Sequence, residues 1–168
     1  MAKIIMNKFK ITLVLLLIAT VTFAQKSPRK QATGSIGGTA VTVDYGAPSV
    51  KGRTIWGDLV PYAKVWRSGA NENTTISFDK NVTIAETTVP AGKYGFFMVP
   101  SESGAWEVIL SKKNDAWGSN GYSKDNDQLR LKVTPKTVAE NTELLTFTVT
   151  KTGVEFVWEK VKIVIPIK

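Results

Sequence analysis

The strongest constraint on the fold is the alternation of apolar and polar residues in many short segments. In one of them, Val41, Val43 and Tyr45 alternate with polar residues. A period of two places such side chains on opposite faces of a strand, so the pattern is typical of half-buried β-strands. The same pattern recurs in residues 106–110, 129–133, 145–149, 154–158 and 161–165. The chain is therefore expected to consist mainly of strands.

Turn residues separate these segments. Gly37 and Gly38 predict a tight hairpin between a weak strand at residues 33–36 and the strand at residues 39–45. Residues 94–99 are apolar on both faces, which predicts a central strand that is covered on both sides.

Residues 73–78 and 82–86 are separated by an Asp-Lys-Asn turn, and we expect them to pair with each other. The only helical candidate is a turn at residues 56–60, which Pro61 would end. About ten short strands at this spacing predict an all-β fold, either a single antiparallel β-sandwich or a jelly-roll-like barrel.

The N-terminal segment has the order of a secretory signal peptide. Lysines precede an apolar run at residues 11–19, and small residues lead up to Ala24. We expect cleavage after Ala24, with residues 1–24 as signal peptide and residues 25–168 as one β-sandwich domain. An uncleaved membrane anchor is the alternative. No cysteine follows to carry a lipid anchor, and no later run is long enough to span a membrane, so a periplasmic or secreted protein is predicted.

The chain contains no histidine and no cysteine. Ser-His-Asp and cysteine catalysis and the usual zinc, copper and haem sites require these side chains, so these chemistries are excluded and no cofactor is predicted. The formal net charge is +8, but the basic residues are scattered, so the sequence does not predict nucleic-acid binding.

The remaining carboxylate chemistry has no clear site in the sequence. A glycosidase-type pair could be drawn from Asp44, Asp58, Glu72 and Glu107, but their spacing selects no two of them, and solvated or ion-paired carboxylates are the alternative. Residues 125–127 begin like a calcium loop but lack its glycine and glutamate, so a turn is expected there and no metal site is predicted.

Two long polar segments interrupt the strands, at residues 46–71 and 112–128. Loops of this length in a compact domain are often functional. In the second segment, Trp117 and Tyr122 could form a stacking platform for sugar rings, or they could cap the open end of the sandwich.

The first segment ends in the densest group of candidate binding residues. Lys64, Arg67 and Asn71 could donate hydrogen bonds to a carboxylate, sulfate or phosphate, with Glu72 orienting Arg67. Alternatively, Arg67 and Glu72 could form a buried ion pair that ties the loop to the sheet. The candidate ligand-binding residues are Lys64, Trp66, Arg67, Asn71, Glu72, Trp117 and Tyr122.

Several stretches also resemble a known family. They are Asp-Tyr at 44–45, Pro-Ser-Val-Lys-Gly-Arg at 48–53, Leu-Val-Pro-Tyr at 59–62, Lys-Val-Trp-Arg at 64–67, Gly-Ala-Asn-Glu at 69–72, Val-Pro-Ala-Gly-Lys-Tyr at 89–94 and Trp-Glu-Lys at 158–160. Together they resemble domain-of-unknown-function family 2911. The resemblance implies a small, exported, β-rich protein of a Gram-negative bacterium. It implies no activity and no catalytic residue.

Three functions remain after these exclusions. The first is a non-catalytic exported binding module whose ligand is a glycan or another anionic envelope component. The alternative is a protein-interaction or structural domain of the envelope, and the third is a carboxylate-dependent glycoside hydrolase. The partner is therefore a small molecule, a glycan or a protein.

Overall fold

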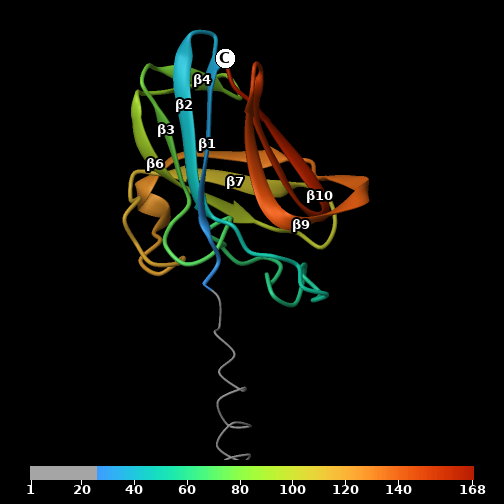
Figure 1. The fold of residues 1–168 in the computed structure, drawn as a ribbon. Helices are drawn as coiled ribbons and strands as arrows, with labels where there is room; N and C mark the ends of the chain where they lie inside the picture. Colours follow the sequence, from blue (N-terminus) through green and yellow to red (C-terminus); the bar gives the residue numbers. More distant parts are fainter. Residues whose placement is uncertain (1–25) are drawn as a thin grey trace, which may run out of the picture.

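The computed structural model describes residues 26–168, in which ten strands and no α-helix occur (Figure 1). The strands are β1 (Arg29–Ile36), β2 (Thr39–Gly46), β3 (Thr75–Phe78), β4 (Val82–Ile84), β5 (Thr87–Val89), β6 (Gly92–Val99), β7 (Trp106–Ser111), β8 (Asp127–Val133), β9 (Lys136–Thr150) and β10 (Gly153–Pro166). A single turn of 3-10 helix, Lys124–Asn126, precedes β8. The predicted signal peptide lies outside the described residues.

The strands form two facing layers. The main sheet is antiparallel with the order β1-β2-β3-β6-β7-β8, and it does not close into a barrel within residues 26–168. A long hairpin of β9 and β10 faces this sheet in Figure 1. The short hairpin of β4 and β5 extends the second layer, because two backbone hydrogen bonds of 2.7 and 2.9 Å join Thr83 to Lys168. The predicted all-β sandwich is confirmed.

The hairpin of β1 and β2 forms where the two glycines predicted it. Gly37 and Gly38 both have positive φ, of 57° and 81°, as a two-residue turn between twisted strands requires. Val41 and Val43 of β2 are buried on the inner face, as the alternation predicts. β1 is longer than expected and begins at Arg29.

The predicted pairing of residues 73–78 with 82–86 is wrong. β3 pairs with β2 and β6 instead, and β4 pairs with β5. Asp79 binds the backbone N–H of Ala40 at 2.7 Å, which ties the turn after β3 to β2. Ala85 and Glu86 adopt positive φ of 47° and 65°, so β4 reverses into β5 through a tight turn that contains no glycine.

Two further expectations are corrected. Residues 56–60 form a non-helical turn in which Val60 N–H binds the carbonyl of Ile55 at 2.8 Å. The two segments expected near the C-terminus are one strand, β10, with a bulge at Glu159, where φ is 55°. The bulge is needed because the buried side chains change from even positions, such as Trp158, to odd ones, such as Ile163.

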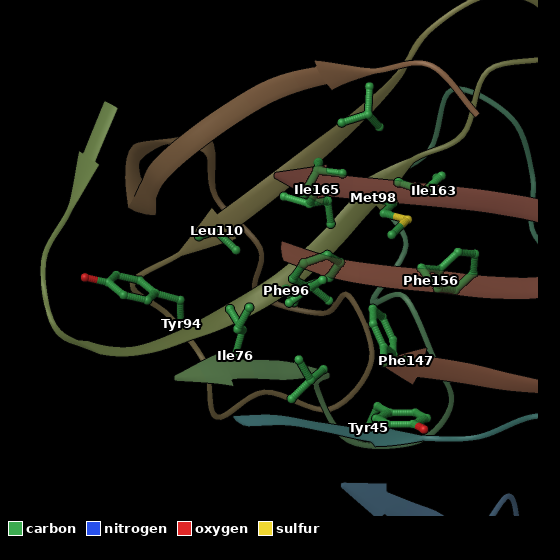
Figure 2. Close-up of a cluster of buried hydrophobic side chains, with 14 of the residues drawn as sticks. Tyr45, Ile76, Tyr94, Phe96, Met98, Leu110, Phe147, Phe156, Ile163 and Ile165 are labelled. Carbon is green, nitrogen blue, oxygen red and sulfur yellow. The ribbon is translucent and has the colours of Figure 1, made fainter. Parts of the chain in front are cut away.

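Aromatic rings join the two layers (Figure 2). The ring of Phe147 on β9 lies 4.9 Å from Tyr45 and 5.4 Å from Phe96, both on the main sheet. It also lies 5.3 Å from Phe156 on β10. Edge-to-face contacts at these distances stabilise the core beyond the burial of apolar area.

Residues 47–72 contribute to the core rather than forming a free loop. Trp56 from this segment packs against Trp66 of the same segment, Trp106 on β7 and Trp158 on β10. Trp66 is stacked on Trp158 with a centroid distance of 5.8 Å and an interplanar angle of 19°. The segment is therefore fixed to both layers of the sandwich.

The outer face of the main sheet is covered as well. Phe97 and Ile109 are buried there, opposite each other on β6 and β7. Tyr122, from the segment of residues 112–128, lies 5.4 Å from the ring of Phe97. The prediction that β6 is a central strand covered on both sides is confirmed.

A close backbone crossing positions the end of the 47–72 segment. Ala70 N–H binds the carbonyl of Gly46 at 3.1 Å. A Cβ atom added at Gly46 would lie 2.1 Å from the carbonyl oxygen of Ala70, and one at Gly69 would lie 2.8 Å from that of Gly46. Only residues without a side chain permit this approach.

The crossing gives the first prediction. Gly46→Ala should lower the free energy of unfolding by about 3 kcal/mol or more, because the new methyl group meets rigid backbone. The melting temperature should then fall by about 10 °C. Gly104→Ala is the control, because its Cβ would meet no atom within 4 Å and it introduces only the strain of a positive φ. Equal melting temperatures for the two variants would contradict the crossing.

Candidate functional site

Trp117 is the most exposed large apolar side chain among the described residues, at 55 %. It lies in the segment of residues 112–128, next to the end of the 47–72 segment, where an isolated antiparallel bridge pairs it with Glu72. The structure therefore brings together two segments that the sequence identified separately. A tryptophan ring that faces solvent in this way needs an explanation, because large aromatic side chains are mostly buried.

Asn73 holds the backbone on both sides of Trp117. Its side chain, buried at 3 % exposure, donates to the carbonyl of Gly118 at 2.5 Å and accepts from Ala116 N–H at 2.9 Å. Its own N–H binds the carbonyl of Ala116 at 3.0 Å, and the carbonyl of Asn71 accepts from Gly118 N–H at 3.0 Å. The backbone that carries Trp117 is thus fixed in place, while the indole ring itself is open to solvent.

A groove of about 320 Å³ runs beside this ring, and we call it the Trp117 groove. Its walls carry guanidinium, ammonium, amide, hydroxyl and carboxylate groups. They come from Arg29, Glu72, Asn73, Thr75, Lys93, Asn114, Asp115, Ala116 and Trp117. It adjoins an open hollow of about 570 Å³ that shares Arg29, Glu72 and Lys93.

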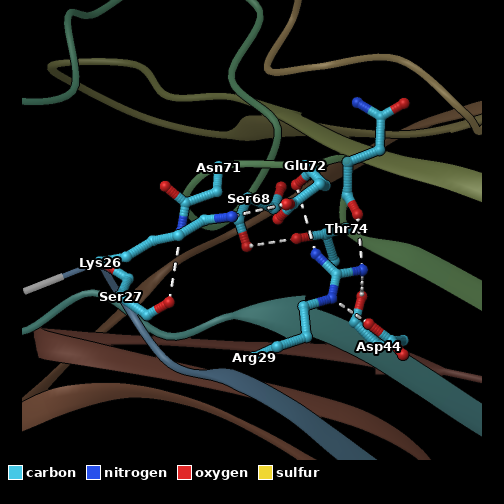
Figure 3. Close-up of polar contacts among 9 residues, drawn as sticks. Lys26, Ser27, Arg29, Asp44, Ser68, Asn71, Glu72 and Thr74 are labelled. Atoms are coloured by element: carbon cyan, nitrogen blue, oxygen red, sulfur yellow. Dashed lines mark hydrogen bonds and ion pairs between the residues drawn. The ribbon is translucent and has the colours of Figure 1, made fainter.

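Two ion pairs lie beside the groove (Figure 3), whereas Lys93 in its lining has no carboxylate within 4.0 Å among the described residues. Lys26 donates to Glu72 at 2.9 Å, and its ammonium group lies 5.2 Å from the centroid of Trp117. Arg29 is paired with Asp44 and donates to the carbonyl of Asn73 at 2.8 Å. Arg29 therefore links the edge of the sheet to the residue that holds Trp117.

The predicted ion pair between Arg67 and Glu72 is wrong. Glu72 pairs with Lys26, and no carboxylate within residues 26–168 lies within 4.0 Å of the Arg67 guanidinium. Ser68 and Asn71 between them have positive φ of 54° and 65°, which turns the chain so that the two side chains diverge. The idea that Glu72 orients Arg67 is overturned by the same geometry.

The other residues of that group also separate. Lys64 is exposed and lines neither the Trp117 groove nor the hollow beside it. Trp66 belongs to the core, and its Nε1–H donates to the carbonyl of Gly69 at 3.2 Å. Asn71 donates to the carbonyl of Ser27 at 3.2 Å and so acts on the backbone.

Tyr122 does not form a platform with Trp117. Its ring covers Phe97, and its hydroxyl donates to Asp127 at 2.9 Å and accepts from Arg130. Burial raises the pKa of Tyr122, and the hydrogen bond to Asp127 raises it further. Tyr122 therefore packs on the outer face of the main sheet rather than at the open end of the sandwich, whereas the ring of Trp117 is exposed.

The candidate carboxylates do not all lie together. Glu107, together with Asp127, binds Arg130 near the outer face of the main sheet. Asp44 and Glu72 line the same hollow, each with a basic partner. A hydrogen bond from Lys26 lowers the pKa of Glu72, so Glu72 is ionised at neutral pH, whereas the general acid of a glycosidase needs a raised pKa.

Sequence reasoning missed several residues of the groove. Lys26, Arg29, Asn73, Lys93, Asn114 and Asp115 were not candidates. Asn73 directly follows the Gly-Ala-Asn-Glu stretch at residues 69–72, but an asparagine beside a strand usually indicates only a turn. No local pattern marks Lys93, because β6 reaches the groove only through the order of strands in the sheet.

Two neighbouring residues provide a test of this geometry. Asn73→Ala should lower the free energy of unfolding by about 1–3 kcal/mol, because it leaves buried backbone groups without partners. The melting temperature should fall by about 2–4 °C for each kcal/mol. Glu72→Ala should leave it nearly unchanged, because the Lys26 pair is exposed. Thermal melts in which Glu72→Ala is the more damaging change would contradict this assignment.

No helix in residues 26–168 is both long enough and apolar enough to cross a membrane. No curated protein and no solved structure matches the chain. The model of the family described as "Protein of unknown function (DUF2911)" matches residues 27–167, and the chain therefore belongs to this family.

Proposed function

We propose that this protein is a non-catalytic binding module that recognises a glycan through the Trp117 groove. The observation that carries the proposal is the exposed ring of Trp117 at the side of a groove rich in hydrogen-bonding groups. Asn73 fixes the backbone on both sides of Trp117, so little backbone freedom is lost when a ligand stacks on the ring.

The composition of the groove suits a sugar. The C–H groups on one face of a pyranose ring pack against an indole, while its hydroxyls both donate and accept hydrogen bonds. The groove offers acceptors in Glu72, Asp115 and the Oδ1 atom of Asn114, and donors in Arg29 and Lys93. The N–H groups of the Asn114 amide already donate to the carbonyls of Lys93 and Lys112. A few polar groups around an apolar surface are the usual means of orienting a small ligand.

The charge balance favours a ligand without a strong charge of its own. Around the groove, Lys26 is paired with Glu72, Arg29 with Asp44, and Asp115 with Lys113 at 2.7 Å. Lys93 has no carboxylate within 4.0 Å among the described residues, but the charged side chains that line the groove are two cations and two carboxylates, Arg29, Lys93, Glu72 and Asp115. The lining therefore carries no net charge, which suits a hydroxyl-rich neutral sugar better than a polyanion. The lowered pKa of Glu72 supports binding without hydrolysis.

A protein ligand is the second candidate. Tryptophan and arginine dominate the binding energy of many protein interfaces, and Trp117 and Arg29 line the same groove. The same variants serve to separate the two functions.

The test uses affinity electrophoresis through gels that contain laminarin, dextran or alginate, together with sedimentation on purified peptidoglycan. Trp117→Ala should weaken retention by about tenfold, because the stacking surface is lost. Val164→Ala, which removes an exposed apolar side chain elsewhere, should behave as wild type. Retention by none of these polymers, or equal retention of Trp117→Ala, would contradict glycan binding. Trp117-dependent capture of a protein would favour the second candidate.

We also propose that the protein acts outside the cytoplasm. The lysines, the apolar run at residues 11–19 and the small residues before Gln25 support export. Osmotic shock of producing cells should release a chain that begins at Gln25, identified by its N-terminal peptide mass. A cytoplasmic chain that retains residues 1–24 would contradict export.

A further inference from the structure

A second pocket, of about 200 Å³, lies between the 47–72 segment and the tryptophan cluster, and we call it the Arg67 pocket. It shares no lining residue with the Trp117 groove. Leu59, Val60, Trp66 and Trp158 give it apolar walls. Its polar side chains belong to Ser27, Arg53 and Arg67.

Two residues of this pocket carry unpaired buried donors. Among the described residues, the buried side-chain nitrogens without a hydrogen-bond partner are Nε1 of Trp56, Nε of Arg67 and Nε1 of Trp158. Trp56 is not a lining residue, but Arg67 and Trp158 both line the pocket, and Trp158 is only 1 % exposed. Buried N–H groups are normally satisfied, so this wall of the pocket is short of hydrogen-bond acceptors. Both nitrogens are covered by protein, so a ligand in the pocket meets the other atoms of Arg67 and Trp158.

The charge at this pocket is also uncompensated. Arg67 and Arg53 line it, and no carboxylate does. Burial lowers the pKa of Arg67, yet a guanidinium keeps its proton at neutral pH. Arg53 uses Nε and Nη2 on the carbonyls of Val50 and Ser49, at 3.1 and 2.5 Å. A partly buried cation without a counter-charge is unfavourable, and a bound anion would relieve it.

The neighbouring surface has the same sign. A hollow of about 330 Å³ shares Ser27 and Arg53 with the pocket and adds Lys26 and Lys51. No acidic residue lines that hollow either. An approaching anion is therefore attracted from outside before it reaches Arg67.

We propose that the Arg67 pocket binds a small organic anion. Its carboxylate or phosphate group pairs with the Nη groups of Arg67, which are not among the buried atoms, and its apolar body packs against Val60, Trp66 and Trp158. A planar guanidinium suits either head group, because it presents parallel donors to two oxygens. This site does not depend on glycan binding at the Trp117 groove.

The experiment follows the indole N–H signals of the five tryptophans in nuclear magnetic resonance spectra of the purified protein. Sodium benzoate, phenyl phosphate and acetate are titrated against sodium chloride at equal ionic strength. Benzoate or phenyl phosphate should shift the Trp158 signal, assigned with a Trp158→Phe variant, to saturation. Acetate should bind at least about tenfold more weakly, because it buries little apolar area. The tighter of the two aromatic probes identifies the head group.

Variants locate the site. Arg67→Met should raise the dissociation constant at least about tenfold, because a charged hydrogen-bond donor is lost. Lys64→Met removes the same charge from an exposed position three residues away and should bind as wild type, as should Trp117→Ala. If Arg67→Met does not fold, Arg67→Lys keeps the charge but loses the paired donors and should weaken binding.

These measurements test anion binding at the Arg67 pocket and not glycan binding at the Trp117 groove. An absence of a saturable Trp158 shift with both aromatic probes in the wild-type protein would overturn the proposal, as would unchanged affinity in the Arg67 variants. Loss of anion binding in Trp117→Ala would also overturn it, because the site would then belong to the groove. Failure of the polysaccharide test leaves these measurements unaffected.

Discussion

The packing of tryptophan rings around Trp56 connects the 47–72 segment with both layers of the sandwich. Trp56 and Trp66 come from a segment without regular structure, while Trp106 and Trp158 come from the two layers of the sandwich. Their mutual contacts fix the segment to both layers, in a chain that has no cysteine for a disulfide. Because residues 47–72 are held in this way, the residues that follow are placed accurately at the start of β3.

That placement creates two surfaces with different chemistry. The Trp117 groove is lined by equal numbers of cations and carboxylates, and its aromatic ring is exposed. In the Arg67 pocket the aromatic rings are buried, and no carboxylate is among the lining residues. Ser68 and Asn71 take positive φ between Arg67, which lines the pocket, and Glu72, which lines the groove. A rigid β scaffold with short-range variation in its loops is a common basis for binding sites.

Neither surface contains a histidine, the side chain whose ordinary pKa lies near neutral pH, because the chain has none. In the groove, the hydrogen bond from Lys26 lowers the pKa of Glu72 and so favours its carboxylate form.

The sequence by itself determined the all-β class, the glycine turn between β1 and β2, the buried face of β2 and the central position of β6, because these depend on local alternation and turn chemistry. It also limited the chemistry through the absence of histidine and cysteine. Only the tertiary structure decided which strands pair, since a turn shows that the chain reverses but not which strand becomes its neighbour. It also separated Trp117 from Tyr122 in one polar segment, because Phe97 on the outer face of the sheet buries the tyrosine while Asn73 holds the tryptophan in solvent.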